Sequence, residues 1–152
     1  MTLSSRTVTR EHVNRLVRLD VRPDQGGRVA PNAVTLAQAA YERGAHVWGL
    51  WEDDTPVGLL AITDQAVADL DDGDEPCCAY LWRLMIDAAH QGRGLGAAAL
   101  RIAEARGRAW GKRHVVTSAT DVENGAVPFY ERHGYHRTGR IVDGEIELVR
   151  DL

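Results

Sequence analysis

A glycine-rich segment in the second half of the chain has the residue types and spacing of an anion-binding loop. It reads Gln-Gly-Arg-Gly-Leu-Gly at 91–96 and follows the apolar run 81–86. The apolar run predicts a buried strand, and the residues from Gly94 onward predict a long helix. The first N–H groups of a helix have no partner within it, and its dipole adds partial positive charge there. Because glycines also let the backbone approach a ligand closely, the segment is expected to bind a phosphate group.

Two common phosphate-binding loops fit these residues poorly. A Walker loop ends in Gly-Lys-Ser/Thr, whereas residues 94–97 read Gly-Leu-Gly-Ala. A dinucleotide-binding fingerprint needs three glycines as Gly-x-Gly-x-x-Gly in the first strand–helix turn. Residues 92–97 lack the third glycine, and they do not lie in the first strand–helix turn, because several expected strands and two expected helices precede them. The pattern that does fit is Gln/Arg-x-x-Gly-x-Gly/Ala.

That pattern resembles the pyrophosphate loop of the Gcn5-related N-acetyltransferase (GNAT) superfamily. Two further segments are similar to motifs of that family: Asn124 followed by Phe-Tyr-Glu-Arg-His-Gly-Tyr at 129–135, and Asp-Gly-Glu-Ile-Glu-Leu at 143–148. The resemblance covers essentially the whole chain. It implies a single N-acetyltransferase domain over residues 1–152, with the α/β GNAT acyl-CoA N-acyltransferase fold and acetyl-CoA as co-substrate.

A narrower resemblance concerns the acceptor. Residues 80–87, 36–41 and 56–59 look like the corresponding segments of bacterial spermine/spermidine acetyltransferases. This implies a polyamine or a related small amine as the substrate. An aminoglycoside, a protein lysine or N-terminal amine, and an acyl-CoA-binding sensor without turnover remain as alternatives.

The family motifs also imply which residues hold the acetyl donor. The pyrophosphate would lie on the loop formed by Gln91, Gly92, Arg93, Gly94, Leu95 and Gly96. Arg93 would either add charge to the phosphate or lie in solvent. The strand end, Leu84, Met85 and Ile86, would offer backbone groups to the pantetheine arm, and Asn124 would hydrogen-bond to it.

Two catalytic groups are expected. The N–H of Ile86 would polarise the thioester carbonyl. Tyr130 would be the general acid for the leaving thiolate, because a phenol with a pKa of about 10 is protonated at pH 7.

The acceptor side is less defined by the sequence. An aliphatic amine with a pKa of about 10.4 is almost fully charged at pH 7 and must lose a proton before it attacks. No carboxylate lies within 79–86, so the proton would pass through water to Glu75, Glu52 or Asp64, which the sequence does not rank. The candidate substrate residues are Glu75, Tyr80, Trp82 and Arg83. Tyr80 is expected on the same strand face as Trp82, Leu84 and Ile86, and Arg83 is expected either to pair with an acid or to position the substrate.

Hydrophobic periodicity predicts the elements that position these residues. Strands are expected at 2–8, 46–51, 57–63, 79–86, 115–119, 135–142 and 145–149. Helices are expected after Thr9, from Asn32 to Gly44 with a break at 22–27 before it, from 94 to 112, and from 124 to 133 with its regular part beginning near Val127. This order predicts a mixed, mostly antiparallel sheet with helices on both faces, in which strand 79–86 runs parallel to strand 115–119. In helix 94–112, Arg101, Glu104 and Arg108 are expected on a face more exposed to water than the buried seam.

Composition narrows the function classes. The 152 residues are 44% hydrophobic and 26% charged, which is typical of one globular domain. The net charge of −4 argues against a nucleic-acid partner. The absence of a long apolar run or a signal-peptide pattern argues against a membrane. The only cysteines, Cys77 and Cys78, are adjacent, and the six histidines lack metal-ligand spacing, so a cytoplasmic protein without a metal is expected, with a homodimer left open.

Overall fold

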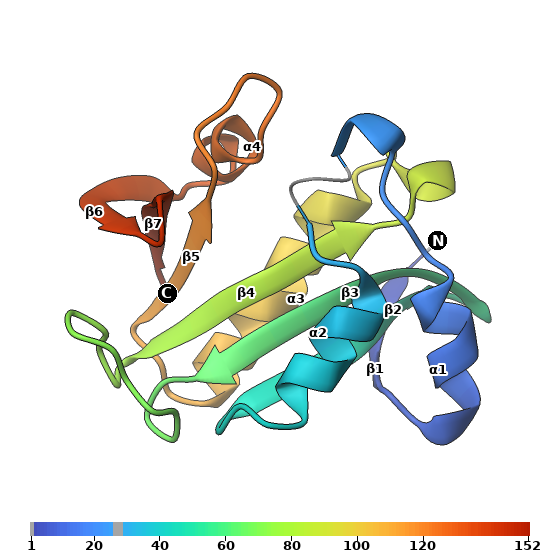
Figure 1. Cartoon of the computed structure of the whole chain (residues 1–152), viewed down its shortest axis with the longest axis horizontal. Coiled ribbons are helices and arrows are strands. Elements are labelled where there is room, and N and C mark those ends of the chain that lie inside the picture. Colours follow the sequence, from blue (N-terminus) through green and yellow to red (C-terminus); the bar gives the residue numbers. More distant parts are fainter. Residues whose placement is uncertain (1, 26–28) are drawn as a thin grey trace.

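The computed structural model describes residues 2–25 and 29–152 (Figure 1). In this described part, seven strands form one sheet in the order β1-β2-β3-β4-β5-β7-β6. The strands are β1 (Leu3–Thr7), β2 (Ala45–Glu52), β3 (Thr55–Asp64), β4 (Cys78–Ile86), β5 (His114–Ala119), β6 (His136–Val142) and β7 (Glu145–Asp151). The helices are α1 (Arg10–Val17), α2 (Asn32–Ala39), α3 (Leu95–Ala109) and α4 (Val127–Arg132), with 3₁₀ turns η1 (Pro23–Gln25) and η2 (Ala88–His90). Of the break predicted at 22–27, Gly26 and Gly27 lie outside the described residues.

The pairing confirms the predicted mixed sheet. Strands β4 and β5 are parallel, and the other neighbours are antiparallel. The parallel ladder runs from Cys78 opposite His114 to Leu81 opposite Thr117 and ends there. Beyond it the two strands diverge, which Figure 1 shows as a widening gap between the arrows. This gap is the feature of the fold that makes room for a site.

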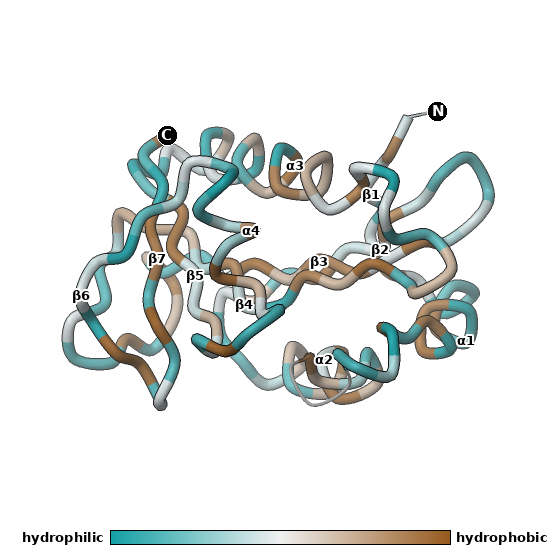
Figure 2. Tube along the Cα trace, turned by 90° about the horizontal axis from the view of Figure 1, so that it is seen from above, coloured by the Kyte–Doolittle hydropathy of each residue, from teal (hydrophilic) through white to brown (hydrophobic). Residues whose placement is uncertain are grey.

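Helices cover both faces of the sheet, as predicted. Figure 2 shows α3 along one face and α1 and α2 along the other. The larger core cluster lies on the α3 side, where Leu95, Ala99 and Leu100 pack on the sheet. A smaller cluster on the other side contains Leu16 and Trp51. Across the residues described, no helix is both long and apolar enough to span a lipid bilayer.

The second helix begins at Asn32, as predicted, but ends before Gly44. Asn32 is its first helical residue, and its buried side chain points into the core. Its Nδ2 donates to the carbonyl of Leu16 at 2.8 Å, so the amide links α2 to α1. Gly44, expected to end the helix, lies five residues after Ala39 and instead precedes β2 with a φ of +78°.

Glu104 of α3 contradicts the prediction of a wetter face. Its side chain is 1% exposed, and its carboxylate is contacted by two arginines. Arg101 approaches it at 3.2 Å from the preceding turn of the helix, and the Nε of Arg150 approaches at 3.2 Å from β7. A charge at this position is tolerated because both partners are cations.

Candidate active site

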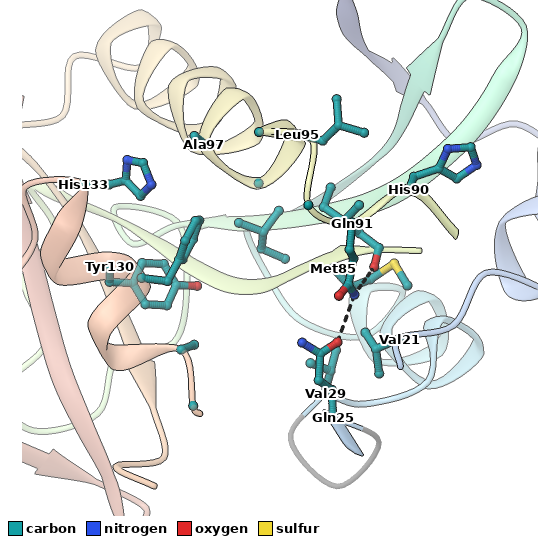
Figure 3. A pocket seen from close by; sticks show the side chains of 18 of the residues that line it. Val21, Gln25, Val29, Met85, His90, Gln91, Leu95, Ala97, Tyr130 and His133 are labelled. Carbon is teal, nitrogen blue, oxygen red and sulfur yellow. Dashed lines mark hydrogen bonds between the residues drawn. The ribbon is translucent and has the colours of Figure 1, made fainter. Parts of the chain in front are cut away.

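The gap between β4 and β5 opens into a cavity of about 590 Å³. Its walls are the end of β4, the glycine-rich loop, the first turn of α3 and helix α4; Figure 3 shows Tyr130 and Gln91 on opposite sides of it. The predicted donor residues that line the cavity are Leu84, Met85, Ile86, Gln91, Gly92, Gly94, Leu95, Gly96, Asn124 and Tyr130. Residues from 84 to 130 therefore share one site.

At the end of β4, the backbone N–H and C=O groups of Leu84 and Ile86 point to one side of the strand, and those of Met85 point to the other. The N–H of Asp87 donates to Val57 of β3 at 2.8 Å, so the backbone groups of Ile86, one residue earlier, face the opposite side. Consistent with this, the side-chain Nε2 of Gln91 donates to the Ile86 carbonyl at 2.9 Å from the cavity. By the same alternation, the backbone groups of Leu84 face the cavity, and those of Met85 face β3. Met85 therefore lines the cavity without offering it backbone hydrogen bonds.

The glycine loop places the start of α3 against this cavity. Gly92 and Gly94 have φ angles of +77° and +80°, a region in which residues with side chains are strained. Gly94 is the N-cap of α3, and the first helical bond runs from the Ala98 N–H to its carbonyl at 3.1 Å. The N–H groups of residues 95–97 therefore precede the first bond within the helix and can serve an anion.

Arg93 differs from the other loop residues. It does not line the cavity; instead its guanidinium donates to both carboxylate oxygens of Glu52 at 2.9 Å each. Among the side chains that do line it, Arg132 brings a cation that sequence reasoning missed. Because residues two positions apart on a helix lie on different faces, its spacing from Tyr130 gave no signal that could have identified it.

Tyr130 is 7% exposed and lies on α4 at the inner end of the cavity. Burial raises the pKa of its phenol to about 12, and the nearby Tyr80 and Glu145 act in the same direction, while a hydrogen bond with Thr117 lowers the pKa. The phenol is consequently protonated at neutral pH and can act as a proton donor.

A second cavity of about 510 Å³ adjoins the first. Three of the four predicted substrate residues, Tyr80, Trp82 and Arg83, line it. The two cavities share Val29, Leu84, Ala126 and Tyr130 as lining residues. Tyr130 thus borders both spaces, which is the arrangement needed by a group that acts between a donor and an acceptor.

A β-bulge in β4 sets the directions of its side chains. Ala61 pairs with Arg83 and Ile62 pairs with Leu81, so Trp82 has no partner on β3. As a result, Leu81 and Ile86 pack in the same core cluster although they are five positions apart, an offset that puts side chains on opposite faces of a regular strand. Tyr80, next to Leu81, therefore faces the opposite side of the sheet from Leu84 and Ile86, and the expectation of a shared face is wrong.

Arg83 lines the second cavity, but the hydrogen bonds found for it among the described residues go to neutral groups rather than to an acid. Its guanidinium donates to the Trp82 carbonyl at 2.8 Å and to the side-chain oxygen of Gln38 at 3.3 Å, and it lies 5.1 Å from the centre of the Trp82 ring. The partners assigned to it among the described residues are a carbonyl and an amide, which leave its positive charge uncompensated.

The three carboxylates expected to receive the proton do not line either cavity. Glu52 is held by Arg93, and Asp64 forms an ion pair with Lys112. Glu75 lines a separate, smaller hollow near the start of β4 and accepts a hydrogen bond from Cys77. The carboxylate of Glu75 and the sulfur atoms of Cys77 and Cys78 lie within 4.8 Å of one another, so these side chains could hold a metal ion. This group was not predicted from the sequence.

Asn124 lines the donor cavity with a φ of +59°. The N-cap of α4 is Ala126 and the helix begins at Val127, as predicted, so Asn124 is not the cap of that helix. A left-handed backbone is more readily adopted by asparagine than by most residues.

Comparison with known proteins agrees with this geometry. The model of a family described as "Acetyltransferase (GNAT) family" matches residues 13–135. No curated protein matches the chain.

Three solved structures illustrate the likeness of the fold. The PaiA N-acetyltransferase from Thermoplasma acidophilum, in complex with coenzyme A, is 13% identical with a TM-score of 0.70, over 100% of both chains. A GNAT family acetyltransferase from Elizabethkingia anophelis, with acetyl-CoA bound, is 12% identical with a TM-score of 0.65, over 99% of this chain and 97% of that one. The GNAT domain of PAT from S. lividans is 19% identical with a TM-score of 0.75, over 99% and 89%. At these identities the likeness is one of fold.

Proposed function

The chain belongs to the acetyltransferase (GNAT) family, and on this premise we propose that it moves an acetyl group from acetyl-CoA to a primary amine of a small polyamine-like acceptor. The observation that carries the proposal is the position of Tyr130. It borders both the cavity lined by the glycine loop and the cavity lined by Tyr80, Trp82 and Arg83. A direct transfer in a ternary complex needs such a meeting point.

The larger cavity supports acetyl-CoA as the donor. The N–H groups at the start of α3 would hold the pyrophosphate, and Arg132 lies near enough to add charge to the phosphates. The backbone groups of Leu84 and Ile86 face the cavity where β4 has left β5, so an extended pantetheine arm would pair with β4 like an added strand. Two of the solved relatives carry coenzyme A or acetyl-CoA.

The proposed chemistry uses two groups of this chain, the Ile86 N–H and the Tyr130 hydroxyl. The Ile86 N–H would hydrogen-bond to the thioester oxygen and stabilise the oxyanion that forms when the amine attacks the carbonyl carbon. When the carbon–sulfur bond breaks, Tyr130 would give its proton to the sulfur and regain one from the nitrogen that has just become cationic. A phenol with a pKa near 12 is protonated before the step and recovers its proton readily after it.

A thiol-release assay with a panel of amines tests the proposal. Spermine, spermidine and 1,4-diaminobutane should release CoA thiol faster than an aminoglycoside or a lysine peptide. Release with the aminoglycoside or the peptide alone would contradict the polyamine assignment. If acetyl-CoA binds but no amine releases thiol, the chain is an acyl-CoA sensor.

A further inference from the structure

The second cavity contains a carboxylate that was not among the predicted site residues. Among the described residues that line it, Glu145 is the only acid. It is the first residue of β7 and follows the turn at Asp143 and Gly144, whose φ angles are +50° and +78°. The tight turn fixes where β7 begins, so the backbone that carries the carboxylate is held in place.

One hydroxyl group contacts the Glu145 side chain, and a second hydroxyl bonds to the first. The Oγ of Ser118 on β5 donates to its Oε1 at 3.3 Å, and the same Oγ lies 3.0 Å from the hydroxyl of Tyr80 on β4. Because a serine hydroxyl has one proton and this one is given to the carboxylate, Tyr80 must be the donor in the second bond. The hydrogen-bond chain therefore runs from Tyr80 through Ser118 to Glu145.

This carboxylate is also close to the predicted acid. Burial is the main cause of the raised pKa of both Tyr80 and Tyr130, and the charge of Glu145 raises the pKa of each further. Glu145 and Tyr130 line the same second cavity, and Tyr130 borders the point where the acetyl group would be transferred.

We propose that Glu145 binds a cationic nitrogen of the acceptor in this second cavity, while a different nitrogen of the same molecule attacks the acetyl group. A nitrogen that is protonated and bound to a carboxylate has no lone pair free for attack. The bound nitrogen and the nucleophile are therefore two atoms, which is the chemistry of a diamine or longer polyamine. Ser118 and Tyr80 are positioning residues for the carboxylate. The inference rests on the proposed function, since it names how the acceptor of that reaction is selected.

The test compares two ligands of matched length: 1,4-diaminobutane, whose two nitrogens are cationic at pH 7, and butane-1,4-diol, which carries no charge. Their affinities are measured by calorimetry on the free protein and on the protein saturated with CoA. The wild type should bind the diamine at least tenfold more tightly, and Glu145→Gln should remove most of that preference without weakening binding of the diol. Asp143→Asn is the matched control: it removes one negative charge from the same hairpin, keeps a residue that tolerates positive φ, and should leave the preference intact.

A second variant guards against loss of folding. Ser118→Ala removes only the hydroxyl that holds Glu145 and should reduce the preference for the diamine partially. In turnover assays, Glu145→Gln should raise KM for the diamine about tenfold and change kcat much less. A wild type that binds both ligands equally, or a Glu145→Gln protein that keeps the preference, would overturn the inference. Absence of thiol release by the wild type would instead count against the proposed function, because the binding measurement does not depend on turnover.

Discussion

Arg93 and Glu52 form a two-pronged ion pair, with both guanidinium nitrogens 2.9 Å from the two carboxylate oxygens. The pair joins the glycine-rich loop to the end of β2; the Glu52 side chain is 7% exposed and the Arg93 side chain 38% exposed, so the carboxylate is the buried member. An arginine in a phosphate-binding motif is ordinarily assigned to the phosphate. Here the geometry gives its charge to a protein carboxylate.

Arg93→Gln should therefore change stability more than ligand binding. The substitution leaves the Glu52 carboxylate without its cation, which costs about 1–3 kcal/mol. The Kd for acetyl-CoA should stay within about threefold, since the helix N–H groups that hold the pyrophosphate are untouched. Urea denaturation and calorimetry measure the two quantities. A Kd raised tenfold with unchanged stability would mean that Arg93 binds the phosphate rather than Glu52.

Gly94→Ala should weaken acetyl-CoA binding at the start of α3. The residue has a φ of +80°, and a methyl group there would meet no protein atom within 4 Å, so it would project into the open space proposed for the pyrophosphate. Gly111→Ala is a matched control, because Gly111 has a φ of +72°, an equally open surrounding and a place at the opposite end of α3. Both variants should lose similar stability from backbone strain, about 1 kcal/mol. Only Gly94→Ala should raise the Kd, by tenfold or more.

The donor side could be predicted because its residues are contiguous. The strand, the glycine turn and the helix follow one another from 79 to 109, and local sequence patterns identify each of them. The parallel pairing of β4 with β5 followed from the intervening helix, since such crossovers are the usual way to join parallel strands. The regular start of α4 near Val127 followed from Pro128 in its first turn.

The acceptor side could not be predicted because its geometry depends on long-range contacts. The bulge at Trp82 appears only when β4 is paired with β3, and it reverses the face of Tyr80 relative to Ile86. Glu145 reaches Ser118 only through the pairing of β5 with β7. Glu104 has the spacing of an exposed helix residue, and only the arrival of Arg150 from β7 gives it a reason to be buried.

Tyr130→Phe should lower kcat by about 100-fold or more, the usual effect of removing a general acid. Acetyl-CoA affinity should remain within about threefold, since the ring that lines the cavity is kept. Steady-state rates and calorimetry separate the two effects. Unchanged turnover would remove Tyr130 from the mechanism.

The pH profile of the wild type offers an independent check on Tyr130. Its pKa is raised to about 12, so the phenol stays protonated below that pH and is lost as a donor only above it. The rate should rise with pH as the acceptor amine, with a pKa of about 10.4, loses its proton. A fall in kcat between pH 8 and 10 that is absent in Tyr130→Phe would contradict the raised pKa.

Arg83→Gln reports on the charge of the natural acceptor. The guanidinium lines the acceptor cavity and is held by the Trp82 carbonyl and Gln38, so its positive charge repels a polycation. For spermidine or 1,4-diaminobutane, KM should fall about two- to tenfold in this variant, with a smaller change for butylamine. If KM rises instead, the cavity is built for an acceptor that carries an anionic group beside its amine.

Glu104→Gln should be destabilising, since it removes the anion that two arginines share. The Glu104 side chain is 1% exposed and lies 3.2 Å from both Arg101 and Arg150, so its loss leaves two cations near each other without that anion. Because the Arg101 and Arg150 side chains are 55% and 27% exposed, solvent screens them, and the cost should be about 1–3 kcal/mol rather than that of a fully buried pair. Urea denaturation measures the loss.

Asp69→Asn is the control for the loss of stability expected in Glu104→Gln. Asp69 is also paired with an arginine, Arg43 at 3.4 Å, but its side chain is 83% exposed, so solvent screens the pair and stability should not change measurably. Equal stabilities of Glu104→Gln and the wild type would mean that the two arginines find other partners when the carboxylate is absent. In that case Arg150, whose Nη1 also donates to the carbonyl of His133, would be held chiefly by that bond, and burial of Glu104 would be a consequence of packing rather than a support of α3 on β7.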